Sequence, residues 1–156
     1  MSLATEALLI GSYAAHLRGV LPAWRQGHIG DADFVCTRAA ASEIMGLFGH
    51  PLTEHVPDRC FRIDRAGGMH IDIDLRGHLL PLVAGHADEM TIALNGIEIT
   101  CLVARADLIA ALRWVSRDLV PKAADKARLD VAGYEAFGIS ITEDLAAAAA
   151  AFRKPT

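Results

Sequence analysis

The chain has 156 residues, of which 53% are hydrophobic and 22% are charged, with a formal net charge of −4 and a pI near 5.9. These values are typical of one globular domain with its own core, and they exclude a disordered chain. Because the balance is acidic and basic residues form no run, we expect no strong DNA binding.

The cysteines and the N-terminal segment indicate the compartment. Cys36, Cys60 and Cys101 are odd in number and widely spaced in apolar surroundings, which favours buried thiols over disulfides or a zinc site. Residues 1–15 lack the basic start of a signal peptide, and Gly11 interrupts an apolar stretch too short to span a membrane. We therefore expect a cytoplasmic protein that does not bind membranes.

Strand and helix patterns alternate along the chain without a linker. The expected strands are residues 4–10, 31–36, 60–64, 69–75, 91–94 and 97–103, and the expected helices are 13–18, 38–48, 107–118, 122–137 and 142–152. Thr37 is a good N-cap for the second helix, and Asn95-Gly96 is typical of a tight hairpin turn. These patterns predict a mixed α/β (α+β) domain with a central sheet of four to six strands and helices mainly on one face.

Two acidic pairs stand out on the predicted strands. Asp31 and Asp33 are two residues apart at a strand start, so both carboxylates face the same side of the sheet. Carboxylates held side by side repel each other and are stable as anions mainly with a cation between them. Asp72 and Asp74 repeat this spacing on a later strand. Together with the Gly-Ser turn upstream, the four acids predict a site for Mg²⁺ and a triphosphate.

The order of these features resembles the minimal nucleotidyltransferase domain of the DNA polymerase beta superfamily, most closely the small nucleotidyltransferase-like proteins common in phage genomes. That pattern has an apolar residue and Gly-Ser before a helix, then Asp-x-Asp between apolar residues, then a carboxylate on a neighbouring strand. The matching positions are Ile10-Gly11-Ser12, Asp31-Ala32-Asp33-Phe34, Asp72 or Asp74, Leu112-Arg113, and Lys126 to Asp130. The resemblance implies a single domain over residues 1–156, with a catalytic core at about 5–103 and C-terminal helices at about 104–153.

The chain departs from this pattern in two respects. Residues 13–30, which separate Gly-Ser from Asp-x-Asp, form a longer gap than usual, so we expect an insertion in the loop around Trp24. The pair Asp72 and Asp74 also leaves the third metal ligand open.

The resemblance implies transfer of a nucleoside monophosphate from a nucleoside triphosphate (NTP) to an acceptor hydroxyl, assisted by two Mg²⁺ or Mn²⁺ ions. Asp31 and Asp33 would bridge both ions, and Asp72 or Asp74 would hold one ion and take the acceptor proton. Gly11 and Ser12 would lie against a phosphate. The charges that would neutralise the triphosphate are those of Arg25, Arg113, Lys122 and Lys126. The acceptor stays open: a small molecule, a tRNA end or a protein side chain.

Other interpretations remain open from the residues alone. Gly-Ser before a helix can be a simple turn, and Asp-x-Asp can be a solvated strand end. Lys126 and Asp130, four residues apart, are most simply an ion pair on a helix surface. His70 shares the predicted strand face of Asp72 and could belong to the same site. Two alternative functions are a non-catalytic nucleotide- or partner-binding protein, such as an antitoxin or adaptor, and a metal-dependent phosphohydrolase.

Overall fold

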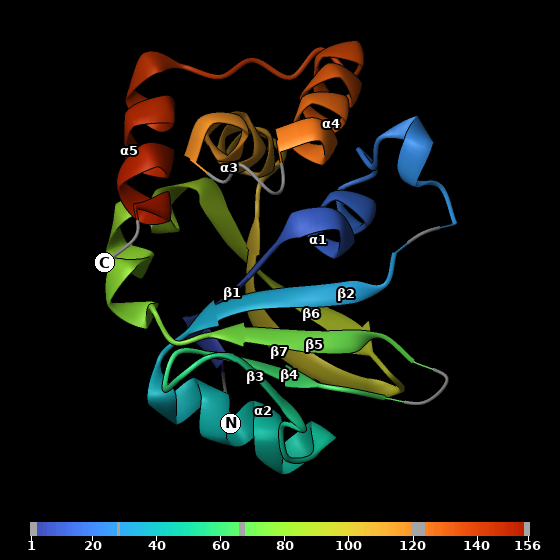
Figure 1. The fold of residues 1–156 in the computed structure, drawn as a ribbon, viewed down its shortest axis with the longest axis vertical. Helices are drawn as coiled ribbons and strands as arrows, with labels where there is room; N and C mark the ends of the chain where they lie inside the picture. Colours follow the sequence, from blue (N-terminus) through green and yellow to red (C-terminus); the bar gives the residue numbers. More distant parts are fainter. Residues whose placement is uncertain (1–2, 28, 66–67, 120–123, 155–156) are drawn as a thin grey trace.

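A seven-stranded mixed sheet forms the centre of the computed structural model, which describes residues 3–27, 29–65, 68–119 and 124–154 (Figure 1). The strands are β1 (Leu3–Ile10), β2 (Asp31–Cys36), β3 (Thr53–Val56), β4 (Cys60–Ile63), β5 (His70–Asp74), β6 (Ala87–Leu94) and β7 (Ile97–Ala104). Their order across the sheet is β3-β4-β5-β2-β1-β7-β6. The pairs β1–β7 and β2–β5 are parallel, and the remaining neighbours are antiparallel.

The mixed α/β architecture predicted from the sequence is confirmed, but the expected number of strands was too low. The additional strand is β3, which lies at one edge of the sheet and pairs only with β4 among the described strands. All four of its residues are exposed, so its sequence carries no apolar alternation. Its backbone hydrogen bonds with β4 define it as a strand, and these cannot be read from composition.

The helices are distributed unequally between the two faces of the sheet (Figure 1). They are α1 (Gly11–Leu17), α2 (Arg38–Phe48), α3 (Ala106–Leu119), α4 (Ala124–Ala136) and α5 (Glu143–Arg153), with short 3-10 turns at η1 (Ala23–Arg25), η2 (Gly77–Leu82) and η3 (Ala84–His86). Figure 1 shows α2 on one side of the sheet and the other four helices on the opposite side. As predicted, Thr37 caps α2 by accepting a hydrogen bond from the Ala40 N–H. None of the described helices meets the length and hydropathy needed to cross a bilayer.

The core occupies both faces of the sheet, under α2 on one side and under the larger helical layer on the other. Leu8 and Leu9 of β1 are both fully buried, as expected for a central strand covered on two faces. Leu108 and Leu112 of α3 and Phe152 of α5 pack into the same core. Apolar burial therefore holds α3 and α5 over the face toward which the acidic residues of β2 point.

The register between β2 and β5 brings the two acidic pairs together. Asp33 of β2 is aligned with Asp72 of β5 across the parallel ladder. On the neighbouring antiparallel ladder, Arg62 of β4 is aligned with Asp72. The alternating residues Ala32 and Ile71 are fully buried on the opposite face. A one-residue slip would bury the carboxylates, so core packing determines this alignment.

Asn95 joins the β6–β7 hairpin to the segment that enters β5. Asn95 and Gly96 have positive φ angles of 47° and 82°, in agreement with the predicted turn. The Asn95 Oδ1 accepts a hydrogen bond from the Met69 N–H at 2.8 Å, and its Nδ2 donates to the Met69 carbonyl at 2.9 Å.

We expect Asn95→Gly to lower the free energy of unfolding by about 1–3 kcal/mol, since glycine keeps the positive φ but removes both hydrogen bonds. Urea denaturation measures this change. Asp58→Gly is the matched control, because Asp58 is exposed and also has a positive φ, of 56°. Equal losses in the two variants would contradict the proposed role of the Asn95 side chain.

Candidate active site

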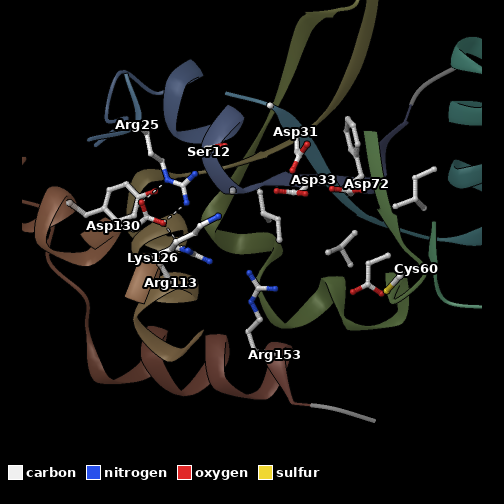
Figure 2. A pocket seen from close by; sticks show the side chains of 18 residues that line it. Ser12, Arg25, Asp31, Asp33, Cys60, Asp72, Arg113, Lys126, Asp130 and Arg153 are labelled. Atoms are coloured by element: carbon white, nitrogen blue, oxygen red, sulfur yellow. Dashed lines mark hydrogen bonds and ion pairs between the residues drawn. The ribbon is translucent and has the colours of Figure 1, made fainter. Parts of the chain in front are cut away.

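One pocket, with a volume of about 560 Å³, contains almost all of the side chains predicted from the sequence (Figure 2). The predicted residues that line it are Gly11, Ser12, Arg25, Asp31, Asp33, Asp72, Asp74, Arg113 and Lys126. Lys122, the remaining predicted residue, lies outside the described residues. Residues from β1–α1, η1, β2, β5, α3 and α4, distant in the sequence, thus surround a single cavity.

Three carboxylates form the sheet side of this pocket, which we call the acidic wall: Asp31, Asp33 and Asp72. Figure 2 shows their side chains next to one another. Burial, together with the negative charges of Asp72 and Asp31, raises the pKa of Asp33 to about 7. The acidic wall therefore favours a bound proton or a nearby cation.

An arginine from β4 supplies a positive charge at the acidic wall. The Arg62 Nε and Nη2 donate to the two oxygens of Asp72 at 2.8 and 2.9 Å. The same Nη2 contacts Asp31 Oδ2 at 3.3 Å, so Arg62 bridges the two carboxylates. These bonds raise the pKa of Arg62, which stays charged. Within residues 3–27, 29–65, 68–119 and 124–154, no three His, Cys, Asp or Glu side chains are already arranged as a metal-binding group.

Asp74 lines the pocket but is held by other arginines. Its Oδ2 accepts a hydrogen bond from the Arg76 Nε at 2.9 Å, and its Oδ1 accepts one from the Arg59 Nε at 3.4 Å. In the β2–β5 ladder Asp74 is aligned with Val35, whereas Asp72 is aligned with an acid of the Asp-x-Asp pair. His70 lies on the same strand, but the carboxylate that its Nδ1 approaches, at 3.2 Å and without a hydrogen bond, is that of Asp64.

Gly11 lies directly against the acidic wall. Its φ of +77° is in the left-handed region, and a Cβ at this position would be 2.6 Å from Asp33 Oδ2. A side chain would therefore be strained and would also collide with the carboxylate. This contact explains why glycine precedes Ser12 here and shows that the Gly-Ser turn and the Asp-x-Asp pair are adjacent in space.

The opposite side of the pocket is built around one buried carboxylate, and we call it the basic wall: Arg25, Arg113 and Lys126 around Asp130. Asp130 is 1% exposed and accepts hydrogen bonds from Arg25 Nε at 2.6 Å, Arg25 Nη2 at 3.0 Å and Arg113 Nε at 2.7 Å. The indole Nε1 of Trp24 donates to it at 3.1 Å. Asp130 thus fixes two guanidinium groups at the pocket, as Figure 2 shows.

This arrangement corrects the simplest interpretation of Lys126 and Asp130. A helix-surface ion pair between them was expected, but Asp130 is buried and its ion-pair partners among the described residues are Arg25 and Arg113. The loop between α1 and β2 explains the difference, because it contains η1, which carries Arg25 into the pocket. There the Arg25 guanidinium lies 4.4 Å from the centre of the Trp24 ring.

Sequence reasoning missed two basic residues at this site. Arg62 contacts the acidic wall, and Arg153 of α5 lines the pocket. The only signal for Arg62 was a basic residue on a strand that neighbours an acidic one. Arg153 follows an alanine run and belongs to no motif, so nothing local indicated its position.

Comparison with known proteins supports the fold. No protein-family model matches the sequence, and a search of curated proteins found no match. A solved structure of an antigenic nucleotidyltransferase-like protein from Paracoccidioides brasiliensis is similar, with a TM-score of 0.51 and 12% sequence identity. The similarity covers 94% of this chain and 78% of that chain. The chain therefore has a nucleotidyltransferase-like fold, while the phage-type and superfamily assignments remain predictions.

We expect Asp130→Ala to lower the free energy of unfolding by about 3–5 kcal/mol, because it leaves two partly buried guanidinium groups without their carboxylate. Asp125→Ala, on the same helix, is the control: its side chain is 98% exposed, and its loss should change stability by at most about 0.5 kcal/mol. Chemical denaturation of the two variants provides the measurement, and equal effects would show that the Asp130 cluster does not stabilise the fold.

Proposed function

We propose that this protein is a Mg²⁺-dependent nucleotidyltransferase that transfers a nucleoside monophosphate from an NTP to an acceptor hydroxyl. The observation that carries this proposal is one pocket with an acidic wall and a basic wall, on a nucleotidyltransferase-like fold. Carboxylate oxygens are the ligands that Mg²⁺ prefers, and guanidinium groups suit phosphate oxygens. A metal–triphosphate complex needs both kinds of surface at the same place.

The acidic wall offers the carboxylate oxygens that a divalent cation takes, once Arg62 moves away from Asp72. Asp31, Asp33 and Asp72 would hold the cation, and because burial and the charges of Asp72 and Asp31 raise the pKa of Asp33, a cation bound there would stabilise its charged form. When bound, the metal would stabilise the charge that develops on the phosphate oxygens during transfer. We propose Asp72, rather than Asp74, as the third ligand, because Asp74 is held by Arg59 and Arg76.

The basic wall would bind and orient the triphosphate. Arg25 and Arg113 share a single buried carboxylate, so together they retain one net positive charge, to which Lys126 adds a second. Their hydrogen bonds to Asp130 restrict rotation, which lowers the entropy lost when a phosphate is bound. The Ser12 hydroxyl lines the same pocket and would donate to a phosphate oxygen.

One observation favours a second candidate, a non-catalytic nucleotide- or partner-binding protein. Arg62 already bridges Asp31 and Asp72, so the protein supplies its own cation at the acidic wall. For metal binding, the Arg62 guanidinium must give up its contacts with Asp72. If it does not, the pocket would bind a nucleotide through the basic wall alone.

The first experiment measures thermal stability with and without Mg²⁺-NTP. We expect the wild-type melting temperature to rise with Mg²⁺-NTP, since a ligand that binds the folded state stabilises it. The double variant Asp31→Asn with Asp33→Asn should be as stable as wild type or slightly more stable without ligand, because it removes clustered negative charges. Its Mg²⁺-dependent shift should disappear, since neutral amides are poor ligands for the metal.

The non-catalytic candidate would be favoured if Mg²⁺-NTP leaves the wild-type melting temperature unchanged and the Asp31→Asn, Asp33→Asn variant is less stable than wild type. In that case the two acids accept structural hydrogen bonds, and the loss would be on the order of 1–3 kcal/mol.

A second experiment tests whether Arg62 competes with the metal. We expect Arg62→Ala to bind Mn²⁺ about tenfold more tightly than wild type, measured by the electron paramagnetic resonance signal of free Mn²⁺, because Asp72 and Asp31 lose their competing cation. Arg59→Ala is the matched control: Arg59 precedes the same strand but contacts Asp74. If both variants bind Mn²⁺ as wild type does, Arg62 does not compete with a metal.

A further inference from the structure

Arg153, at the end of α5, points into the pocket between the acidic and basic walls (Figure 2). Its Nε is buried and has no hydrogen-bond partner among the described residues. No ion pair joins its guanidinium to any described carboxylate either. The side chain as a whole is partly buried, but a buried guanidinium nitrogen without a partner is unusual.

The position of Arg153 is held by the packing around it. Arg76, which is 5% exposed, donates through Nη1 to the carbonyl oxygens of Phe152 and Lys154, both at 3.3 Å. Arg76 is fixed in turn by its bond to Asp74, and Phe152 is fully buried. These contacts satisfy carbonyls at the C-terminus of α5 and anchor the helix end to the sheet. Arg153 is therefore directed into the pocket by a rigid support.

The electrostatic surroundings of Arg153 favour the binding of an anion. Burial, and then the positive charges of Arg113 and Arg76, lower the pKa of Arg153 to about 10. The charges of Asp33 and Asp74 act in the opposite direction but do not compensate. A guanidinium surrounded in this way destabilises the ligand-free protein, and an anion that entered the pocket would remove that penalty.

We propose that Arg153 binds a phosphate group of the NTP, opposite the acidic wall and beside Arg113. This inference rests on the proposed function and adds a binding residue to it. The planar fork of arginine matches two oxygens of a phosphate, which gives orientation as well as attraction. Arg153 adds its positive charge to those of Arg25, Arg113 and Lys126, and together these charges can neutralise much of the negative charge of a triphosphate.

The test uses inorganic triphosphate in the presence of EDTA, so that no metal contributes to binding, and isothermal titration calorimetry of the full chain. We expect Arg153→Met to weaken binding at least tenfold, while Arg153→Lys gives an intermediate affinity because it keeps the charge but not the fork. Arg128→Met is the control, since Arg128 is 65% exposed, lies outside the pocket and should bind as wild type does.

The melting temperature of the ligand-free variants separates binding from a structural role. Methionine keeps the apolar stem and removes an unpaired charge whose Nε is buried, so Arg153→Met should melt about 2–4 °C higher than wild type. A purely structural arginine would give a lower melting temperature and an unchanged affinity for triphosphate, and that pair of results would overturn the proposal.

The outcomes also distinguish this inference from the proposed function. If Arg113→Met loses triphosphate binding while Arg153→Met retains it, the proposal for Arg153 is wrong and the nucleotide pocket stands. If wild type binds neither triphosphate in EDTA nor Mg²⁺-NTP, both proposals are wrong.

Discussion

The parallel pairing of β2 with β5 is the constraint on which the rest of this site depends. It aligns Asp33 with Asp72 and places Asp31 beside them, so three carboxylates share one face of the sheet. Their mutual repulsion and the burial of Asp33 would be unfavourable without nearby positive charge. The surrounding elements supply that charge from two directions: β4 contributes Arg62, and α5 contributes Arg153. The pocket thus combines clustered negative charges on the sheet with positive charges from β4 and α5.

Asp130 organises the other side of the pocket by a different mechanism. It is a single buried carboxylate on α4 that accepts hydrogen bonds from Trp24 and Arg25 of η1 and from Arg113 of α3. Because its partners hold the η1 loop and α3 against α4, the group that positions the cations also connects the helical layer. We infer that stability and ligand binding are linked at this point: the residues that would face a phosphate are held by an interaction that the fold itself requires.

The residues of the acidic wall and most of the other pocket side chains were predictable from the sequence, whereas the tertiary contacts of Arg62, Arg153 and Asp130 were not. Asp-x-Asp and the Gly-Ser turn carry local signals, since strand alternation and the Gly11 backbone are properties of a few neighbouring residues. The role of Arg62 depends on the register between β4 and β5, a long-range feature. The position of Arg153 depends on how α5 docks onto Arg76, and the partners of Asp130 depend on how the η1 loop packs against α4. Short motifs do not encode such tertiary contacts, so their partners were missed or misinterpreted.

The measurement that tests the central claim most directly is a crystal structure of the protein with Mn²⁺ and a non-hydrolysable NTP analogue, using the anomalous signal of manganese. Our account predicts a manganese peak among Asp31, Asp33 and Asp72, with Arg62 withdrawn from Asp72. The triphosphate should lie against Arg25, Arg113 and Arg153. A nucleotide bound outside this pocket, or a bound nucleotide with no manganese at the acidic wall and Arg62 still in place, would contradict it.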